Sequence, residues 1–289
     1  MELFDAIIIG HGPAGCSAAL YLCRAGKRVV VVGKDRGALG KAEMIQNYYG
    51  LTMRGRDLVA AGQKQCAELG AQMVEDEVLS LEWLEDGAFE AQRAGGEAIT
   101  AKTALLATGK VTHIPNIEGI RDFEGRGVSY CAVCDAFLYR GREVAVLGGG
   151  AYARHEMEEL LPLAKKVTLF TQGAEPEFDP PREVRVLKKK LLRLHGEDTL
   201  SAAEMEDGRT QDLAGLFVAL GTASAGDLAR KLGLRLKNNA VPVGTSQETT
   251  LPGLFAAGDC TGSFAQVAFA VAEGAKAGLG MIAFLRNNA

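Results

Sequence analysis

The stretch FDAIIIGHGPAGCSAALYLCRAGKRVVVVG, residues 4–33, decides the fold of the chain. Its apolar start, FDAIII, is typical of a parallel strand that is covered on both faces. The glycine turn GHGPAG comes next, followed by an alanine-rich helix that ends at Gly26 and by the second strand, RVVVVG. Glycines at this spacing, between a strand and a helix, predict a βαβ unit that holds a dinucleotide pyrophosphate at the helix N-terminus.

A second unit of this kind occupies residues 143–170. The sequence EVAVLGGGAYARHEMEELLPLAKKVTLF again reads as strand, glycine turn, helix and strand. Residues 250–285 then return to a strand and a long helix. We therefore expect an α/β fold with two dinucleotide-binding, Rossmann-like, three-layer domains, the second inserted into the first. The predicted boundaries are 1–111 and 242–289 for the first domain and 112–241 for the insert.

Length and charge narrow the class of protein. A chain of 289 residues with 47% hydrophobic residues can bury a large core. The formal net charge of −4 gives no general attraction for a polyanion, so nucleic acid is not an expected partner. The N-terminus reads as a strand and not as a signal peptide, and Glu273 and Lys276 interrupt the apolar stretch Phe264–Leu285. We expect no membrane span and a cytoplasmic location.

The cysteines favour redox chemistry over a metal. Six cysteines in a chain of this length are too few for a secreted disulfide framework. Cys131 and Cys134 form a CxxC, which without a second Cys or His pair is at most half of a zinc site, so no metal is expected. The remaining cysteines read as small buried hydrophobes: Cys16, Cys23, Cys66 and Cys260.

Five motifs in a fixed order carry a resemblance to a known family. They are GHGPAG at Gly10–Gly15, ATG at Ala107–Gly109, CAVCD at Cys131–Asp135, GGG at Gly148–Gly150 and LFAAGD at Leu254–Asp259. With these motifs nearly the whole chain resembles the low-molecular-weight thioredoxin reductases. The resemblance implies a homodimer with an FAD domain, an inserted domain that carries a redox-active disulfide, and thioredoxin as the protein substrate.

The resemblance also implies roles for single residues. Cys134 would lie against the flavin and Cys131 would attack the substrate disulfide. Asp135 would pass protons between dithiol and flavin, although it also reads as an acid favoured by the dipole of a helix N-terminus. The residues implied in FAD binding are Gly10, Gly12, Pro13, Ala14, Gly15, Thr108, Gly109, Gly258, Asp259 and Gln266.

The second dinucleotide unit departs from the NADPH-using members. Those members carry a His-Arg-Arg cluster after the second strand, because a 2′-phosphate needs fixed cations. Here residues 167–181 contain no Lys or Arg and instead carry Glu175, Glu177 and Asp179. The bulky ring of Tyr152, just after the glycine turn, could also fill the cofactor slot. NADPH is therefore not expected.

This pattern is most similar to the ferredoxin-dependent flavin thioredoxin reductases, which implies ferredoxin as the electron donor. An acidic donor needs a local basic site, for which the candidates are Lys188, Lys189, Lys190 and Arg193. The same cations also read as the solvated face of a helix with an apolar side formed by Val184, Leu187, Leu191 and Leu194.

Three alternatives stay open at this point. The chain could be an NAD(P)H-dependent thioredoxin reductase, a dithiol oxidase that uses oxygen to close a disulfide in a small molecule, or a non-catalytic flavoprotein. The intact CxxC followed by Asp135 argues against the last of these. Bleaching of the flavin by NADPH would identify the first.

Overall fold

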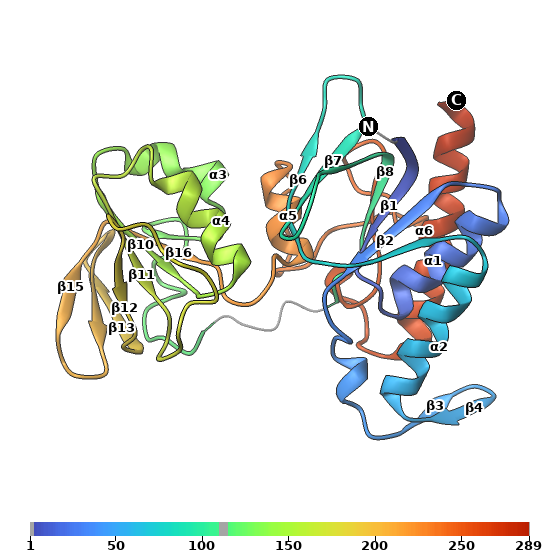
Figure 1. Cartoon of the computed structure of the whole chain (residues 1–289), viewed down its shortest axis with the longest axis horizontal. Coiled ribbons are helices and arrows are strands. Elements are labelled where there is room, and N and C mark those ends of the chain that lie inside the picture. The colour runs from blue at the N-terminus through green and yellow to red at the C-terminus, as the bar shows by residue number, and fades with distance from the viewer. Residues whose placement is uncertain (1–2, 110–114, 289) are drawn as a thin grey trace. The chain divides into compact units, whose positions relative to one another are not determined.

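The computed structural model describes residues 3–109 and 115–288. Contacts divide the chain into two compact units, Met1–Val111 with Ser224–Ala289 and, inserted between them, Thr112–Ala223. Figure 1 shows the inserted unit in green to yellow-orange. Each unit carries helices and a sheet whose central strands are parallel, so the predicted α/β fold with two Rossmann-like domains is confirmed.

The second domain boundary differs from the predicted one. The sequence places it after residue 241, but residues 224–241 pack with the first unit. Helix α5 (Ala225–Lys231) contacts strand β6 (Val78–Trp83), and the amide of Ala225 donates a hydrogen bond to Thr108 Oγ1 at 2.8 Å. These contacts hold α5 in the first unit. The first predicted boundary, after residue 111, lies in 110–114, outside the described residues.

The first unit is built on a seven-stranded sheet. Its strands are β1 (Leu3–Ile9), β2 (Val29–Gly33), β5 (Gln72–Glu75), β6 (Val78–Trp83), β7 (Phe89–Arg93), β8 (Ile99–Leu106) and β17 (Leu254–Ala256). The order is β5-β2-β1-β8-β7-β6, with β17 also paired to β8. Strands β5, β2, β1, β8 and β17 are parallel, and β6 and β7 are antiparallel additions. The central position of β1 explains its continuously apolar sequence.

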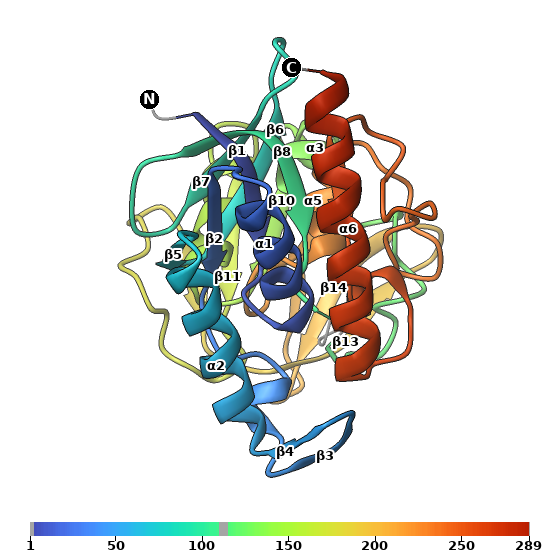
Figure 2. The ribbon, with the colours of Figure 1, turned by 90° about the vertical axis from the view of Figure 1, so that its right-hand side faces the viewer.

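Three helices cover this sheet on one side, and Figure 2 shows α6 beside α1. The helices are α1 (Pro13–Arg24), α2 (Gly55–Glu68) and α6 (Val267–Asn287), with short 3₁₀ turns at η1 (Leu39–Lys41) and η3 (Asp259–Thr261). A small hairpin, β3 (Ile45–Tyr48) and β4 (Leu51–Met53), precedes α2. Helices α1 and α6 approach so closely that a Cβ at Gly274 would lie 2.1 Å from the Ala14 carbonyl oxygen.

Helix α6 is long and apolar enough to cross a membrane by length and composition, with a mean hydropathy of 1.5. Its small buried residues, among them Ala270, Gly274 and Ala277, pack on α1. This packing is a sufficient physical reason for an apolar helix in a folded domain. The absence of a membrane span stays a prediction.

The inserted unit has a five-stranded parallel sheet. Its strands, in spatial order, are β12 (Arg185–Leu187), β11 (Lys166–Phe170), β10 (Glu143–Leu147), β16 (Gly215–Val218) and β9 (Val128–Ser129). A second, antiparallel sheet follows, with β13 (Leu191–Gly196), β14 (Leu200–Met205) and β15 (Thr210–Asp212). The helical segments are α3 (Ala132–Asp135), η2 (Ala136–Tyr139) and α4 (Ala151–Leu160).

The interpretation of residues 184–194 as a helix is wrong, because this segment forms strands β12 and β13. The register of β13 against β14 shifts between Leu191 and Arg193. The irregularity lets Leu191 and Leu194, three residues apart, both be buried. A spacing that looks helical in the sequence is therefore produced by an irregular strand.

The contact between α1 and α6 generates a prediction for Gly274→Ala. Helix propensity alone favours alanine by about 1 kcal/mol. We expect the opposite sign, a loss of about 1–3 kcal/mol in the free energy of unfolding, because the new Cβ meets the Ala14 carbonyl. Urea unfolding of the two proteins measures the difference. A more stable Gly274→Ala protein would show that this contact is not close.

Candidate active site

The inserted unit contains a disulfide between Cys131 and Cys134, with the two Cα atoms 5.4 Å apart. The bond spans the start of α3, whose N-cap is Cys131, and Cys131 Sγ accepts a hydrogen bond from the amide of Cys134 at 3.1 Å. Two residues between the cysteines thus bring the sulfurs together at a helix N-terminus. This is the setting in which a CxxC thiol becomes reactive.

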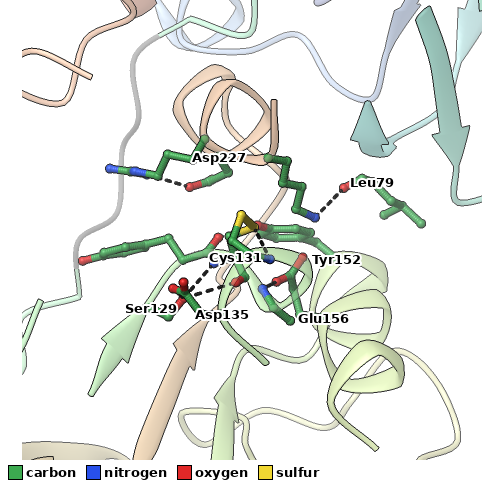
Figure 3. Close-up of a disulfide and its surroundings, with 12 residues drawn as sticks. Leu79, Ser129, Cys131, Asp135, Tyr152, Glu156 and Asp227 are labelled. Carbon is green, nitrogen blue, oxygen red and sulfur yellow. Dashed lines mark hydrogen bonds and ion pairs between the residues drawn. A yellow bond between two sulfur atoms is a disulfide. The ribbon is translucent and has the colours of Figure 1, made fainter. Parts of the chain in front are cut away.

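The acid that follows the disulfide is held by a serine. Ser129 Oγ donates to Asp135 Oδ2 at 2.6 Å and accepts from the amide of Cys131 at 3.1 Å (Figure 3). Burial raises the pKa of Tyr139, and the charge of Asp135 adds to the shift. Asp135 lies in the first turn of α3, where the helix dipole favours an acid. Its role in proton transfer stays a prediction. Ser129 was not identified from the sequence.

Helix α4 supplies two more side chains to the disulfide segment. The hydroxyl of Tyr152 donates to the carbonyl of Tyr130 at 3.2 Å, and Glu156 Oε2 accepts from the amide of Ala132 at 2.5 Å (Figure 3). The ring of Tyr152 is buried, and its hydroxyl is directed to the backbone next to Cys131. The sequence did not identify Glu156, because Glu158 and Glu159 on the same helix look equivalent to it.

The exposure of the two cysteines is unequal. Cys131 is 3% exposed, whereas Cys134 is exposed. This is the reverse of what the expected roles require for substrate attack, in which Cys131 is presented to the partner. Attack by Cys131 would thus require a change that uncovers it.

The other cysteines belong to the first unit. Cys16, Cys23, Cys66 and Cys260 are free thiols, and Cys16, Cys66 and Cys260 are buried. Burial raises the pKa of Cys260 to about 12, so its thiol stays protonated at neutral pH. Among the described residues no group of His, Cys, Asp and Glu could hold a metal ion.

In the first unit, the residues expected to bind FAD come together at one edge of the sheet. Strand β8 pairs in parallel with both β1 and β17, so the carboxyl ends of these strands lie side by side. The segments that follow them are Gly10–Gly15 after β1, Thr108–Gly109 after β8 and Gly258–Asp259 after β17. This edge is where open α/β sheets bind their ligands.

The turn after β1 is open where a pyrophosphate would lie. Gly12 is the N-cap of α1 in an extended conformation that any residue can adopt, and a Cβ built on it meets no atom within 4 Å. Gly15 differs, because its Cβ would lie 1.9 Å from the Gly10 carbonyl oxygen. Gly15 is thus required by the protein itself, whereas Gly12 leaves room for a phosphate at the N-terminus of α1, with Pro13 as its first residue. The site fits FAD.

Other predicted FAD residues have structural partners. Thr108 Oγ1 accepts from α5, and Ala14 packs against both Gly258 and Gly274. Gln266 is the N-cap of α6, and its Oε1 accepts from Asn47 Nδ2 at 2.7 Å. Two residues that the sequence did not suggest also lie here. Glu273 Oε2 accepts from the amide of Gly258 at 2.8 Å, and Asn47 joins the β3–β4 hairpin to α6.

The acidic loop of the same chain contacts the second glycine turn. The amide of Glu177 donates to the Gly149 carbonyl at 2.7 Å. A Cβ built on Gly150, the N-cap of α4, would lie 3.3 Å from Glu177 Oε2. The carboxylate therefore lies at the helix N-terminus that would bind a pyrophosphate in the corresponding position of the first turn. The Glu177 carboxylate thus lies beside this position, whereas the hydroxyl of Tyr152 donates to the carbonyl of Tyr130.

Comparisons with known proteins agree with this site. A family model described as pyridine nucleotide-disulphide oxidoreductase matches residues 4–274. The thioredoxin reductase of Aquifex aeolicus is 30% identical over 98% of this chain and 94% of its own length. The fold and the paired cysteines define a flavoprotein disulfide reductase. The chain belongs to the thioredoxin reductase family, and this membership implies FAD.

Two solved structures are also similar to this chain. The atypical thioredoxin reductase TRi from Desulfovibrio vulgaris Hildenborough has a TM-score of 0.93 and 39% sequence identity, with 98% of each chain covered. A ferredoxin-flavin thioredoxin reductase from Clostridium acetobutylicum has a TM-score of 0.76 and 30% identity, with 99% of each chain covered. The family therefore includes members whose names differ in the electron donor.

The open turn generates a prediction for Gly12→Val. Valine fits the extended backbone and its Cβ meets no protein atom within 4 Å, so the folded apoprotein should keep its thermal stability. The side chain would take the room left for the pyrophosphate, so we expect the purified variant to carry less than about a tenth of the wild-type FAD. Flavin absorbance per protein measures the content. A yellow Gly12→Val protein would show that FAD does not use this turn.

Proposed function

We propose that this disulfide reductase takes electrons from a one-electron donor protein of the ferredoxin type, and not from NADPH. In this proposal the electrons pass through FAD and the Cys131–Cys134 pair to thioredoxin or a similar protein disulfide. The observation that carries the proposal is the carboxylate of Glu177 beside Gly150. This position of the carboxylate supports the conclusion that the second dinucleotide unit does not bind a pyridine nucleotide.

The electrostatics of the acidic loop support this proposal. A nucleotide at the second glycine turn would bring its phosphates to the N-terminus of α4, next to the negative charge of Glu177. Lys188, a nearby cation, forms an ion pair with Glu175 at 2.5 Å. Residues 167–181 contain no Lys or Arg to offset the repulsion. The similarity to the ferredoxin-flavin enzyme of C. acetobutylicum is in line with such a donor.

The energetics of the proposed transfer are favourable. A plant-type ferredoxin near about −400 mV that reduces a thioredoxin dithiol near about −270 mV releases roughly 6 kcal/mol for two electrons. The conversion of single electrons into a pair is the chemistry that FAD supplies when bound. The residues proposed to hold it are those at the carboxyl edge of the first sheet, with Gly12 next to the pyrophosphate.

The chain's own part is thiol–disulfide exchange. Two electrons and two protons open the Cys131–Cys134 bond to two thiols. The Cys131 thiol then loses its proton, and the thiolate attacks the partner disulfide and forms a mixed disulfide. The Cys134 thiol loses its proton in turn, and its thiolate attacks that bond, which restores the intramolecular disulfide and leaves the partner as a dithiol. Asp135, bonded to Ser129, is the acid proposed to supply and accept the protons.

A protein substrate is supported by the surface around the disulfide. Val133, Phe137 and Leu138 are exposed apolar side chains within a few residues of Cys134. Apolar side chains of this kind, gathered near a reactive group, are typical of a protein docking site. We therefore favour thioredoxin over a small-molecule dithiol.

The basic cluster named from the sequence gives weaker support for a donor site. Lys188, Lys189 and Arg193 form ion pairs with Glu175, Asp207 and Glu118. These carboxylates offset the positive charge that an acidic ferredoxin would need.

Assembly and location are proposed on more general grounds. Phe269 and Leu279 of α6 and Tyr21 of α1 are exposed, which supports a homodimer that covers this face. A cytoplasmic location follows from the redox chemistry, because the cytosol keeps thiols reduced. Both stay predictions.

The donor proposal predicts the outcome of anaerobic reduction. NADPH or NADH at about 1 mM should leave the flavin absorbance of the wild-type holoenzyme unchanged, because Glu177 repels the phosphates. Photoreduced ferredoxin should bleach it and, with thioredoxin present, give turnover. Prompt bleaching by NADPH would refute the proposal and establish the NAD(P)H-dependent alternative. Turnover with oxygen and a small dithiol alone would identify the oxidase.

A loop variant tests the role of Glu177 directly. Glu177→Ala should strengthen NADH binding about tenfold, since one carboxylate at the N-terminus of α4 is removed. The matched control is Asp179→Ala, a carboxylate two residues further along the same loop. Quenching of flavin fluorescence by NADH measures both. Equal NADH affinities for the two variants would show that Glu177 does not specifically weaken nucleotide binding at the second glycine turn.

The roles of the cysteines are tested by trapping. If Cys131 attacks the partner, Cys134→Ser should form a stable mixed disulfide with a thioredoxin that lacks its resolving cysteine, and Cys131→Ser should not. Non-reducing gels and mass spectrometry detect the product. A complex formed only by Cys131→Ser would show that Cys134, the more exposed cysteine, attacks the partner.

A further inference from the structure

Helix α4 brings a buried carboxylate to the redox disulfide. Glu156 is 1% exposed, and its Oε2 accepts a hydrogen bond from the amide of Ala132, the residue directly after Cys131. The neighbouring acids Glu158 and Glu159 are exposed on the same helix. Only one of the three acids of α4 is thus directed at the disulfide segment (Figure 3).

The position of this carboxylate has an energetic cost. A buried carboxylate loses its hydration and is retained only with hydrogen bonds that replace water. One such bond comes from the first amide of α3, a group that has no partner inside the helix. In a CxxC at a free helix N-terminus, such amides stabilise the cysteine thiolate and lower its pKa. Here Glu156 accepts from the amide of Ala132, directly after Cys131, while the amide of Cys134 donates to Cys131 Sγ at 3.1 Å.

From this geometry we infer that Glu156 is a positioning residue that keeps the reduced Cys131–Cys134 pair in its protonated dithiol form. The carboxylate takes up the Ala132 amide and sets a negative charge near Cys131, and both effects disfavour a thiolate there. Reduction then consumes two electrons and two protons, one proton for each sulfur. Without the charge of Glu156, the pKa of the Cys131 thiol would fall and the disulfide would be easier to reduce.

Other titratable groups face the same segment, and a neutral Glu156 variant leaves them in place. Asp135 comes from α3, Tyr139 from η2, and Tyr152 and His155 from α4 itself. The two strands packed against α4 carry one titratable residue each, Glu143 in β10 and Lys166 in β11, at the first position of the strand. A shift specific to a Glu156 variant is therefore not due to a change in these groups.

The test uses the FAD-loaded protein, reduced chemically and then freed of reductant, so it does not depend on the natural electron donor. The pH dependence of iodoacetamide alkylation at Cys131 and Cys134 is measured by mass spectrometry. For Glu156→Gln we expect the midpoint of the profile to fall by about one pH unit, and thus about tenfold faster alkylation below both midpoints. Glu156→Asp, which keeps the charge, should return toward wild type.

Glu159→Gln is the matched control, an exposed acid on the same helix, and its profile should coincide with wild type. A second measurement is the disulfide–dithiol equilibrium in dithiothreitol buffers. At a given buffer composition, a larger fraction of Glu156→Gln than of wild type should be in the dithiol form. Melting temperatures distinguish an effect of Glu156 on folding from an effect on thiol ionisation. If Glu156→Gln melts earlier but keeps the wild-type pH profile and redox equilibrium, or if Glu159→Gln shifts them equally, the inference is overturned.

Discussion

The N-terminus of a helix attracts an anion. Each glycine-rich turn of this chain leads into such a helix, but the two helix N-termini differ in what lies beside them. At the first turn, Gly12 leaves the N-terminus of α1 open. At the second turn, the Glu177 carboxylate lies beside Gly150 at the N-terminus of α4. Two units with the same βαβ construction therefore differ at this turn, because the N-terminus of one helix is open and the N-terminus of the other has a carboxylate beside it.

The second unit has a structural role at the redox disulfide. Its sheet and α4 support the disulfide segment, which Ser129, Tyr152 and Glu156 hold by hydrogen bonds to the backbone around Cys131. Helix α4 thus has one end at the closed glycine turn and an inner face at the redox pair. This division explains how a domain could lose nucleotide binding and still be required for electron transfer.

The sequence predicted the parts of the molecule that depend on local pattern. The βαβ units, the CxxC and the order of the motifs follow from glycine spacing and apolar runs, and these expectations agree with the fold. The same reasoning wrongly predicted a helix that includes Leu191 and Leu194, because the register shift in the strand Leu191–Gly196 spaces its buried residues as a helix would. The roles of Glu156 and Ser129 could not be predicted from the sequence for another reason. Their roles depend on which backbone amide lies opposite them, and only tertiary packing determines that.

In the function proposed for this protein, Glu177 closes the second glycine turn to pyridine nucleotides. This is tested by a crystal structure of the oxidised holoenzyme, grown with NADPH at a millimolar concentration. We expect FAD at the Gly10–Gly15 turn and the Glu177 carboxylate beside Gly150 with no nucleotide there. An ordered NADPH pyrophosphate at the N-terminus of α4, with the loop of Glu177 moved away, would show that the turn is open to NADPH.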